Sequence, residues 1–237
     1  MTELFNIKDY VVVITGGTGI LGRCIAKYPA LEGAKVIILG RKADVGNKIA
    51  AEIQAAGGVC EFMKTDVMDQ AVVQKNCDDI MAKYGRIDTL LNAAGGNMPG
   101  ATIAPDKNFF DLETEQFQKV LNLNLTGTVI PTQVFLKPMV AQGKGSIINF
   151  SSMAAFRPIT RVCGYAAAKA GITKESLSGN CRIIEEYPFD SETRFMAVHC
   201  SYGSEKRIYF KGAEEVILPR CSQYMDENGR PAAMTAA

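Results

Sequence analysis

Short apolar runs alternate with segments of helical spacing along the first two thirds of the chain. Runs of about four to eight apolar, largely β-branched residues are typical of strands buried on both faces of a parallel sheet. Regular β–α alternation predicts an α/β fold, a Rossmann-like doubly wound parallel sheet in a single domain over residues 1–237. The predicted strands cover residues 10–15, 34–39, 59–66, 87–96 and 146–152, and the predicted helices cover residues 23–29, 43–56, 69–84, 114–140 and the surroundings of Tyr165.

A glycine-rich turn joins the first predicted strand to the first predicted helix. Gly17, Gly19 and Gly22 form a G-x-G-x-x-G pattern with a strand before it and a helix after it. Such glycines allow a tight turn and a close approach to a pyrophosphate at the positive end of the helix. The alternative is a turn that only connects two elements. Pro29 is expected to kink or end the helix that follows.

The end of the second predicted strand bears on the choice of cofactor. A carboxylate there would bind the ribose 2′-hydroxyl of NAD, but this position holds Gly40, followed by Arg41 and Lys42. Glycine leaves room for a 2′-phosphate, and Arg41 can pair with it. NADP is therefore the expected cofactor and NAD remains possible. The alternative is that both cations only solvate a loop.

Composition narrows the class of protein. A formal net charge of +1 and a mean hydropathy of +0.03 favour neither a nucleic-acid nor a membrane partner. The seven cysteines form no C-x-x-C pair, which favours free thiols and a cytoplasmic location. His199 is the single histidine, so a site with several histidine ligands is excluded and no metal is expected. The N-terminus lacks the layout of a signal peptide.

Tyr165 and Lys169 suggest proton-transfer chemistry. Residues four apart share one face of a helix, so the ammonium of Lys169 can lie beside the phenol of Tyr165. A tyrosine has a pKa of about 10, and a neighbouring positive charge favours the phenolate. Ser152, thirteen residues before the tyrosine, could bond the same substrate oxygen. The alternative is a half-buried tyrosine next to a solvated lysine.

These motifs together resemble the short-chain dehydrogenase/reductase family over residues 8 to about 172. The resemblance implies catalytic roles for Ser152, Tyr165 and Lys169, and a water-holding role for Asn124, whose alternative role is that of a buried asparagine at a helix bend. It also implies a homodimer or homotetramer. The cofactor residues that it implies, with those of the second strand's end, are Thr15, Gly16, Gly17, Thr18, Gly19, Ile20, Leu21, Gly22, Arg41, Lys42, Asp66, Val67, Asn92, Ala93, Ala94, Gly95, Tyr165 and Lys169.

Within the family, the sequences of three segments are similar to those of D-mannonate/D-fructuronate oxidoreductases. These segments are GGNMPGAT, FFDL and SSMAAFRPITRV. Arg157 and Arg161 could clamp a substrate carboxylate, and Asn97 or Asp106 could bind its hydroxyls. The alternative for both arginines is a solvated loop position. The expected small-molecule substrate is thus a sugar acid.

Agreement with the family pattern ends after residue 172. Residues 193–200 can pass for a sixth strand, but the proline-glycine that usually follows is missing. The segment after Lys169 is more polar than the helix expected there, and Gly179, Asn180 and Pro188 interrupt it. A divergent tail, a truncated chain and an altered reading of this segment remain open.

The predicted function is that of an NAD(P)-dependent oxidoreductase that interconverts a ketone and a secondary alcohol. A reductase of 3-oxoacyl thioesters or of other carbonyl compounds is the alternative among enzymes. A catalytically silent protein that senses NAD(P) on the same fold is the alternative from another class.

Overall fold

The computed structural model describes residues 6–156, 160–171, 181–187, 195–202, 205–212, 221, 223–225 and 231–233. The chain forms two compact units, one of residues 7–173 and one of residues 174–237 with residues 1–6. Sequence analysis predicts one domain over residues 1–237, with family resemblance only up to about 172. The boundary between the two units coincides with the limit of that resemblance.

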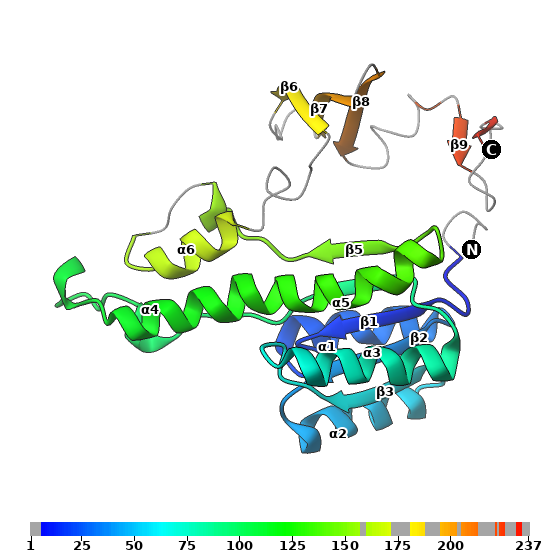
Figure 1. Cartoon of the computed structure of the whole chain (residues 1–237), viewed down its shortest axis with the longest axis horizontal. Coiled ribbons are helices and arrows are strands. Elements are labelled where there is room, and N and C mark those ends of the chain that lie inside the picture. Colours follow the sequence, from blue (N-terminus) through cyan, green and yellow to red (C-terminus); the bar gives the residue numbers. More distant parts are fainter. Residues whose placement is uncertain are drawn as a thin grey trace. The chain divides into compact units, whose positions relative to one another are not determined.

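The larger unit is built on a parallel sheet with the strand order β3-β2-β1-β4-β5 (Figure 1). All four pairings within this sheet are parallel. The order reverses direction between β1 and β4, and in doubly wound sheets ligands bind at such a switch point. The Rossmann-like fold predicted from the sequence is confirmed. The strands are β1 (Val11–Thr15), β2 (Lys35–Gly40), β3 (Val59–Lys64), β4 (Thr89–Asn92) and β5 (Ser146–Asn149).

Two helical layers cover the two faces of this sheet. Val12 and Ile14 of β1 pack with residues of α1 and α2, whereas Val11 and Val13 pack with residues of α3 and α5. Because both faces of β1 are covered, all five of its residues are buried, which explains the uninterrupted apolar run. The helices are α1 (Ile20–Leu31), α2 (Ala43–Ala55), α3 (Gln70–Tyr84) and α5 (Gly127–Ala141).

Two predicted helices differ from their expected form. The helix predicted over 114–140 is divided into α4 (Thr114–Leu121), a π-helical turn (Asn122–Thr126) and α5. The first helix does not end at Pro29 but continues to Leu31, two residues beyond a proline that has no N–H to donate within the helix. The remaining helical segments of this unit are η2 (Pro99–Ala101), η3 (Phe109–Asp111), η5 (Met153–Ala155) and α6 (Cys163–Ala170).

The smaller unit contains only strands among its described elements. β7 (Phe195–Tyr202) lies between β6 (Cys181–Tyr187) and β8 (Glu205–Gly212), and both pairings are antiparallel. A second pair joins β9 (Gln223–Met225) to β10 (Pro231–Ala233). The prediction that residues 193–200 form a sixth strand of the parallel sheet is wrong. Because so few residues separate β7 from β8, only antiparallel pairing of these neighbours is possible.

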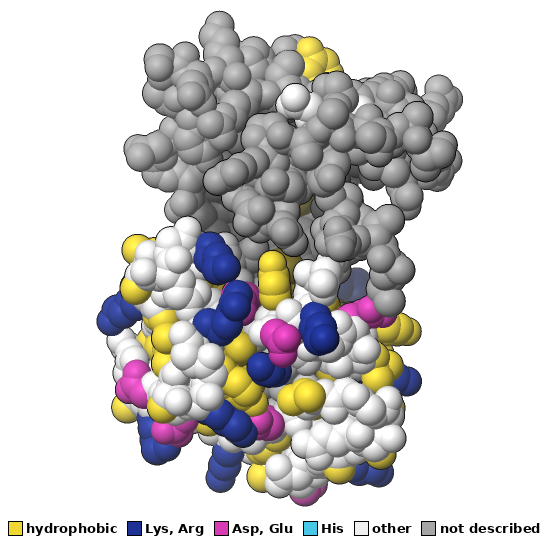
Figure 2. Space-filling view, turned by 90° about the vertical axis from the view of Figure 1, so that its right-hand side faces the viewer, with side chains coloured by type: hydrophobic (Ala, Val, Ile, Leu, Met, Phe, Trp, Pro, Cys, Tyr) yellow, Lys and Arg dark blue, Asp and Glu magenta, His cyan; other side chains and the backbone are white. Residues whose placement is uncertain are grey.

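Charged side chains of both signs are interspersed on the face shown in Figure 2. Lysines and arginines lie beside aspartates and glutamates there, in keeping with the net charge of +1. Within the part of the chain that the structure describes, no helix is long and apolar enough to cross a bilayer.

Asp88 ties together the beginnings of three strand segments. Its side chain is 5% exposed and accepts hydrogen bonds from Val11 N (2.9 Å) and Arg86 Nε (2.8 Å). Its backbone carbonyl accepts from Ser146 N at 2.8 Å. Replacing Asp88 by alanine would leave a buried N–H and a guanidinium without their acceptor.

We expect Asp88→Ala to lower the free energy of unfolding by about 2–3 kcal/mol, as measured by urea denaturation. The control is Asp79→Ala, since Asp79 pairs with Lys75 at 2.5 Å on an exposed face of α3. An exposed pair of this kind contributes less than about 0.5 kcal/mol. Equal losses in the two variants would show that Asp88 has no special role.

Candidate functional site

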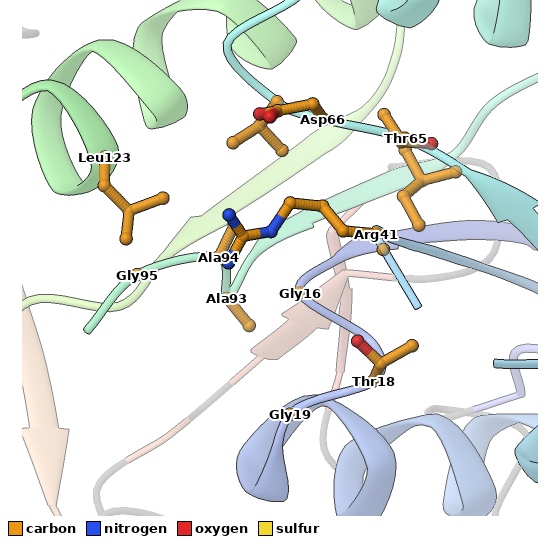
Figure 3. A pocket seen from close by; sticks show the side chains of 13 residues that line it. Gly16, Thr18, Gly19, Arg41, Thr65, Asp66, Ala93, Ala94, Gly95 and Leu123 are labelled. Carbon is orange, nitrogen blue, oxygen red and sulfur yellow. The ribbon is translucent and has the colours of Figure 1, made fainter. Parts of the chain in front are cut away.

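A pocket lies at the carboxyl ends of β1, β2 and β4, where the strand order reverses (Figure 3). Nine of the predicted cofactor residues line it: Gly16, Thr18, Gly19, Arg41, Asp66, Val67, Ala93, Ala94 and Gly95. Leu39, Gly40, Thr65 and Leu123 complete the lining. Sequence analysis did not assign Leu39, Thr65 or Leu123, although Thr65 directly precedes Asp66 and Leu123 directly precedes Asn124.

The glycine turn passes very close to the end of β4. Gly16 has a φ of 66°, and a Cβ atom there would lie 2.6 Å from the carbonyl oxygen of Ala93. Thr15 Oγ1 accepts a hydrogen bond from Ala94 N at 3.2 Å, which holds the two segments together. The turn therefore provides a backbone cradle of the kind that a pyrophosphate requires.

The beginning of α1 suits a negatively charged group. Its N-cap is Gly19, which offers no capping side chain, and its first turn holds no acidic residue. The helix dipole therefore faces the pocket without a competing carboxylate. Ile20 and Leu21 are 86% and 61% exposed and do not line the pocket.

The end of β2 places one cation in the pocket. Gly40 is buried, and the Arg41 side chain extends across the pocket toward the segment Ala93–Gly95 (Figure 3). Lys42 is instead the N-cap residue of α2 and is not part of the lining. Of the two cations predicted to bind the cofactor, only Arg41 thus lines the pocket.

The end of β3 supplies a polar wall to the pocket. Asp66 Oδ1 accepts a hydrogen bond from Met68 N at 3.0 Å, so the carboxylate is held at the rim. Thr65 is 2% exposed and accepts a hydrogen bond from Asn76 Nδ2 at 2.7 Å. Asp66 and Val67, both expected to bind the cofactor, therefore belong to the lining of the pocket.

Asn92 links the ends of β4 and β5 to α5. Its Nδ2 donates to Thr132 Oγ1 at 3.0 Å and to Asn149 Oδ1 at 2.9 Å. The side chain is buried and does not line the pocket. Asn92 therefore supports the segment Ala93–Gly95 from below and has no place at the pocket surface.

Asn124 is bound to the backbone of Gly96 from both sides of its amide. Its Oδ1 accepts from Gly96 N at 3.0 Å, and its Nδ2 donates to Gly96 O at 2.7 Å. The side chain is fully buried within the π-helical turn. This turn is what brings the amide to the loop that follows β4.

Lys169 and Tyr165 lie side by side on α6. The distance from Lys169 Nζ to the ring centre of Tyr165 is 5.7 Å. A Cβ atom at Gly95 would lie 2.6 Å from Asn124 Oδ1 and 3.5 Å from Lys169 Nζ, so two of the predicted catalytic residues converge at this glycine. The structure thereby brings together Tyr165, Lys169, Asn124 and the end of β4.

Lys169 is buried without a carboxylate partner among the described residues. It is 6% exposed, and its Nζ donates to Phe150 O at 2.8 Å. Burial lowers the pKa of Lys169 below its ordinary value, because the charged form loses hydration. A buried, unneutralised ammonium costs stability, and such groups cluster at functional sites.

Ser152 takes part in a local contact in this structure. Its Oγ accepts a hydrogen bond from Ala154 N at 3.2 Å and thereby caps η5. The neighbouring Ser151 Oγ donates to Lys169 O at 3.2 Å and fixes the end of α6 to the segment after β5. Ser152 as a residue is neither fully buried nor fully exposed.

The predicted substrate residues are less closely gathered. Asn97 Nδ2 donates to Thr102 Oγ1 at 2.7 Å, within the loop after β4. Arg161 is exposed and has a φ of 70°, and its carbonyl oxygen accepts from Ile103 N at 2.9 Å, which ties the two loops together. Arg157 lies outside the described residues. Within the described ranges, no group of three histidine, cysteine or acidic residues could hold a metal ion.

Comparison with known proteins gives a family for most of the chain. Residues 10–180 match the family model of the short chain dehydrogenases. The uncharacterized oxidoreductase UxuB of Bacillus subtilis is 38% identical over 175 residues, which make up 70% of this chain and 63% of that protein. The NADP-dependent (R)-specific alcohol dehydrogenase of Lentilactobacillus kefiri is 34% identical over 230 residues, or 95% of this chain and 86% of that protein.

A solved structure shows the same architecture. It comes from Haemophilus influenza, contains bound NAD and carries the name "putative D-Mannonate oxidoreductase". It is 36% identical, with a TM-score of 0.67, and the match covers 70% of this chain and 63% of that one. This chain therefore spans less than two thirds of the length of both that protein and the Bacillus relative.

The end of the chain is also similar to a different family. Residues 163–237 match the model of the P-type ATPase, cytoplasmic domain N, and the two family matches overlap over residues 163–180. The second match includes the whole segment 174–237 of the smaller compact unit. With more than two thirds of its residues covered by the dehydrogenase model and a relative 34% identical along 95% of its length, this chain belongs to the short-chain dehydrogenase/reductase family.

Proposed function

We propose that this chain is an NAD(P)-dependent oxidoreductase that interconverts a ketone and a secondary alcohol on a small polyhydroxy substrate. The observation that carries the proposal is the convergence of Lys169 and Asn124 at Gly95, with Tyr165 beside the lysine. Gly95 is also part of the pocket that suits a dinucleotide. The proton-transfer groups and the cofactor pocket therefore share one border.

Each side chain has a distinct task in the proposed reaction. The bound cofactor supplies or accepts a hydride at its nicotinamide. Tyr165 gives a proton to the substrate oxygen during reduction and takes it back during oxidation. The ammonium of Lys169 stabilises the phenolate that remains, and Ser152 donates a hydrogen bond to the same substrate oxygen. Asn124 positions the water through which the proton exchanges with solvent.

NADP is the cofactor that we propose. The support is that Gly40 provides no carboxylate for a ribose 2′-hydroxyl and that Arg41 lies in the pocket. Arginine pairs with phosphate through two parallel hydrogen bonds. One relative is named NADP-dependent, and the Haemophilus structure contains NAD, so relatives of both kinds exist.

A sugar acid is the substrate that we propose. The support is the name of the Haemophilus structure, which refers to D-mannonate, a hydroxylated carboxylic acid. On this chain, Arg161 is the described cation nearest in sequence to the proton-transfer helix, and its left-handed backbone is unusual for a side chain of its size. Such backbone strain is often found at functional sites.

The first test removes the proton donor. Tyr165→Phe should lower kcat by about 10²–10⁴ while the dissociation constant for NADPH stays nearly the same, because only the hydroxyl is lost. Tyr28→Phe is the matched control, since Tyr28 is 71% exposed on α1. Retention of more than about a tenth of kcat would remove Tyr165 from the mechanism. Binding without turnover in the unmutated chain would favour a cofactor sensor.

The second test separates the role of Lys169 in turnover from the loss of stability that its burial causes. Lys169→Met removes a buried charge and keeps most of the volume, so we expect a gain on the order of 1 kcal/mol in unfolding free energy. Turnover should be lost in the same variant.

The pH dependence of this gain has a definite sign. The pKa of Lys169 is lowered in the folded state, so stability is lost as pH falls through that pKa. The advantage of Lys169→Met should therefore be largest near neutral pH and shrink as pH approaches about 10.4, the pKa of an unfolded lysine. Thermal unfolding of both proteins between these pH values measures it, and a methionine variant that is less stable at neutral pH would contradict the argument.

The third test concerns the nucleotide. Arg41→Ala should weaken NADPH binding by about 1.5–3 kcal/mol, the value of a hydrogen bond to a charged group, and leave NADH binding largely unaffected. Lys42→Ala is the matched control, because Lys42 does not line the pocket. Fluorescence titration gives all the dissociation constants. Tighter binding of NADH than of NADPH by the unmutated chain would show that the proposed preference is wrong.

The last test concerns the substrate. Oxidation of NADPH should be followed with D-fructuronate and with D-fructose, a neutral ketose of the same length. Arg161→Ala and Arg157→Ala should be compared, and at least one should raise KM for the acid about tenfold more than for the neutral sugar. Equal effects of each variant on both sugars would exclude a carboxylate clamp at these arginines.

A further inference from the structure

The side chain of Thr18 lies directly against the end of β2. A Cβ atom at Gly40 would lie 2.8 Å from both Thr18 Cγ2 and Thr18 Oγ1, and 3.4 Å from Thr18 Cβ. Carbon atoms that are not bonded to one another are best separated by about 3.5–4.0 Å. Position 40 therefore has no room for any side chain while threonine stands at position 18.

The glycine turn cannot easily move away to make that room. Gly17 N donates a hydrogen bond to Leu39 O at 3.1 Å. A Cβ atom at Gly17 would lie 2.5 Å from Ile38 Cβ, so the backbone of the turn already rests on β2. Moving Thr18 outward would break this hydrogen bond and separate the two segments.

A change of rotamer cannot make the room either. A threonine places two heavy atoms in three staggered positions around Cβ, and two of these positions face Gly40. Any rotamer must therefore leave at least one heavy atom in the way. Valine has the same property, whereas serine has a single heavy atom that can occupy the third position.

We propose that Thr18 is a specificity-determining residue for the nucleotide. By excluding every side chain at position 40, it excludes the carboxylate that would bind a ribose 2′-hydroxyl. Both Thr18 and Arg41 line the pocket, where a hydroxyl and a guanidinium together suit a 2′-phosphate. The inference rests on the proposed dinucleotide binding, and it makes the preference a property of the pair Thr18–Gly40.

The test is a set of variants of the full chain that differ only at these two positions. Dissociation constants for NADPH and NADH are measured by fluorescence titration, with the melting temperature of each variant. Gly40→Ala alone should weaken the binding of both nucleotides by about tenfold or more. Thr18→Ser combined with Gly40→Ala should recover most of that loss. Thr18→Val combined with Gly40→Ala is the matched control and should recover none.

If Gly40→Ala does not fold, the melting temperatures provide the same comparison. Recovery of a folded protein by serine, and not by valine, supports the steric conflict. Normal binding by Gly40→Ala alone, or equal recovery by serine and valine, would overturn the inference.

Aspartate at position 40 extends the test to the choice of nucleotide. Relative to Thr18→Ser alone, Thr18→Ser with Gly40→Asp should shift the ratio of the two dissociation constants toward NADH by about tenfold or more. Gly40→Asp with Thr18 retained should lose both nucleotides. A full change of preference with Thr18 retained would overturn the inference. Failure of the unmutated chain to bind either nucleotide would instead overturn the proposed function, while the melting temperatures would still test the contact.

Discussion

Backbone from two different strands meets at Gly16, and the geometry of the site follows from this meeting. β1 lies between β2 and β4, so the turn that leaves β1 must pass between the ends of both neighbours. It is held on one side by Ala94 N and Thr15 Oγ1, and on the other by Gly17 N and Leu39 O. A side chain at Gly16 would push the turn off β4. At Gly16 and Gly19 the pocket therefore presents bare backbone, which can approach a phosphate more closely than side chains can.

The second half of the site depends on a charge that the fold buries at a cost. Lys169 Nζ donates a hydrogen bond to a backbone carbonyl oxygen. The position of this ammonium next to Tyr165 and Gly95 does not add to the stability of the hydrophobic core. Burial of this ammonium is therefore unfavourable for the stability of the fold. The surrounding segments supply the rigidity that such a group requires, as the bond from Ser151 to the end of α6 illustrates.

Local patterns predicted the parallel sheet and the glycine turn correctly, because both are specified by neighbouring residues. The apolar run of β1 and the glycines that follow it determine the local structure through residues that are only a few positions apart in the sequence. The π-helical turn could not be predicted in this way, since it accompanies bonds between Asn124 and Gly96, which lie 28 positions apart. Leu123 was missed for the same reason, because its place in the pocket depends on that turn.

At the end of the chain, local sequence patterns do not determine how the strands pair. An apolar run over residues 193–200 fits a parallel strand as well as an antiparallel one, and its partners β6 and β8 decide between them. The weak family agreement after residue 172 was the useful signal there, because it marks the same boundary as the change of compact unit. The similarity of residues 163–237 to a P-type ATPase domain overlaps the dehydrogenase match only over residues 163–180.

Because of the π-helical turn, the geometry of the site is sensitive to the deletion of a single residue, an effect that substitutions do not test. A π-turn is an α-helix with one additional residue, and each residue of a helix advances the chain by about 100° around the axis. Loss of any one residue between Asn122 and Thr126 would let α4 and α5 join as a regular helix, with the polar composition almost unchanged. One of the two helical segments would then be rotated about the helix axis relative to the other. The side-chain amide of Asn124 would no longer reach the loop after β4. In this protein, the register of one helix matters to the site as much as the identity of its residues.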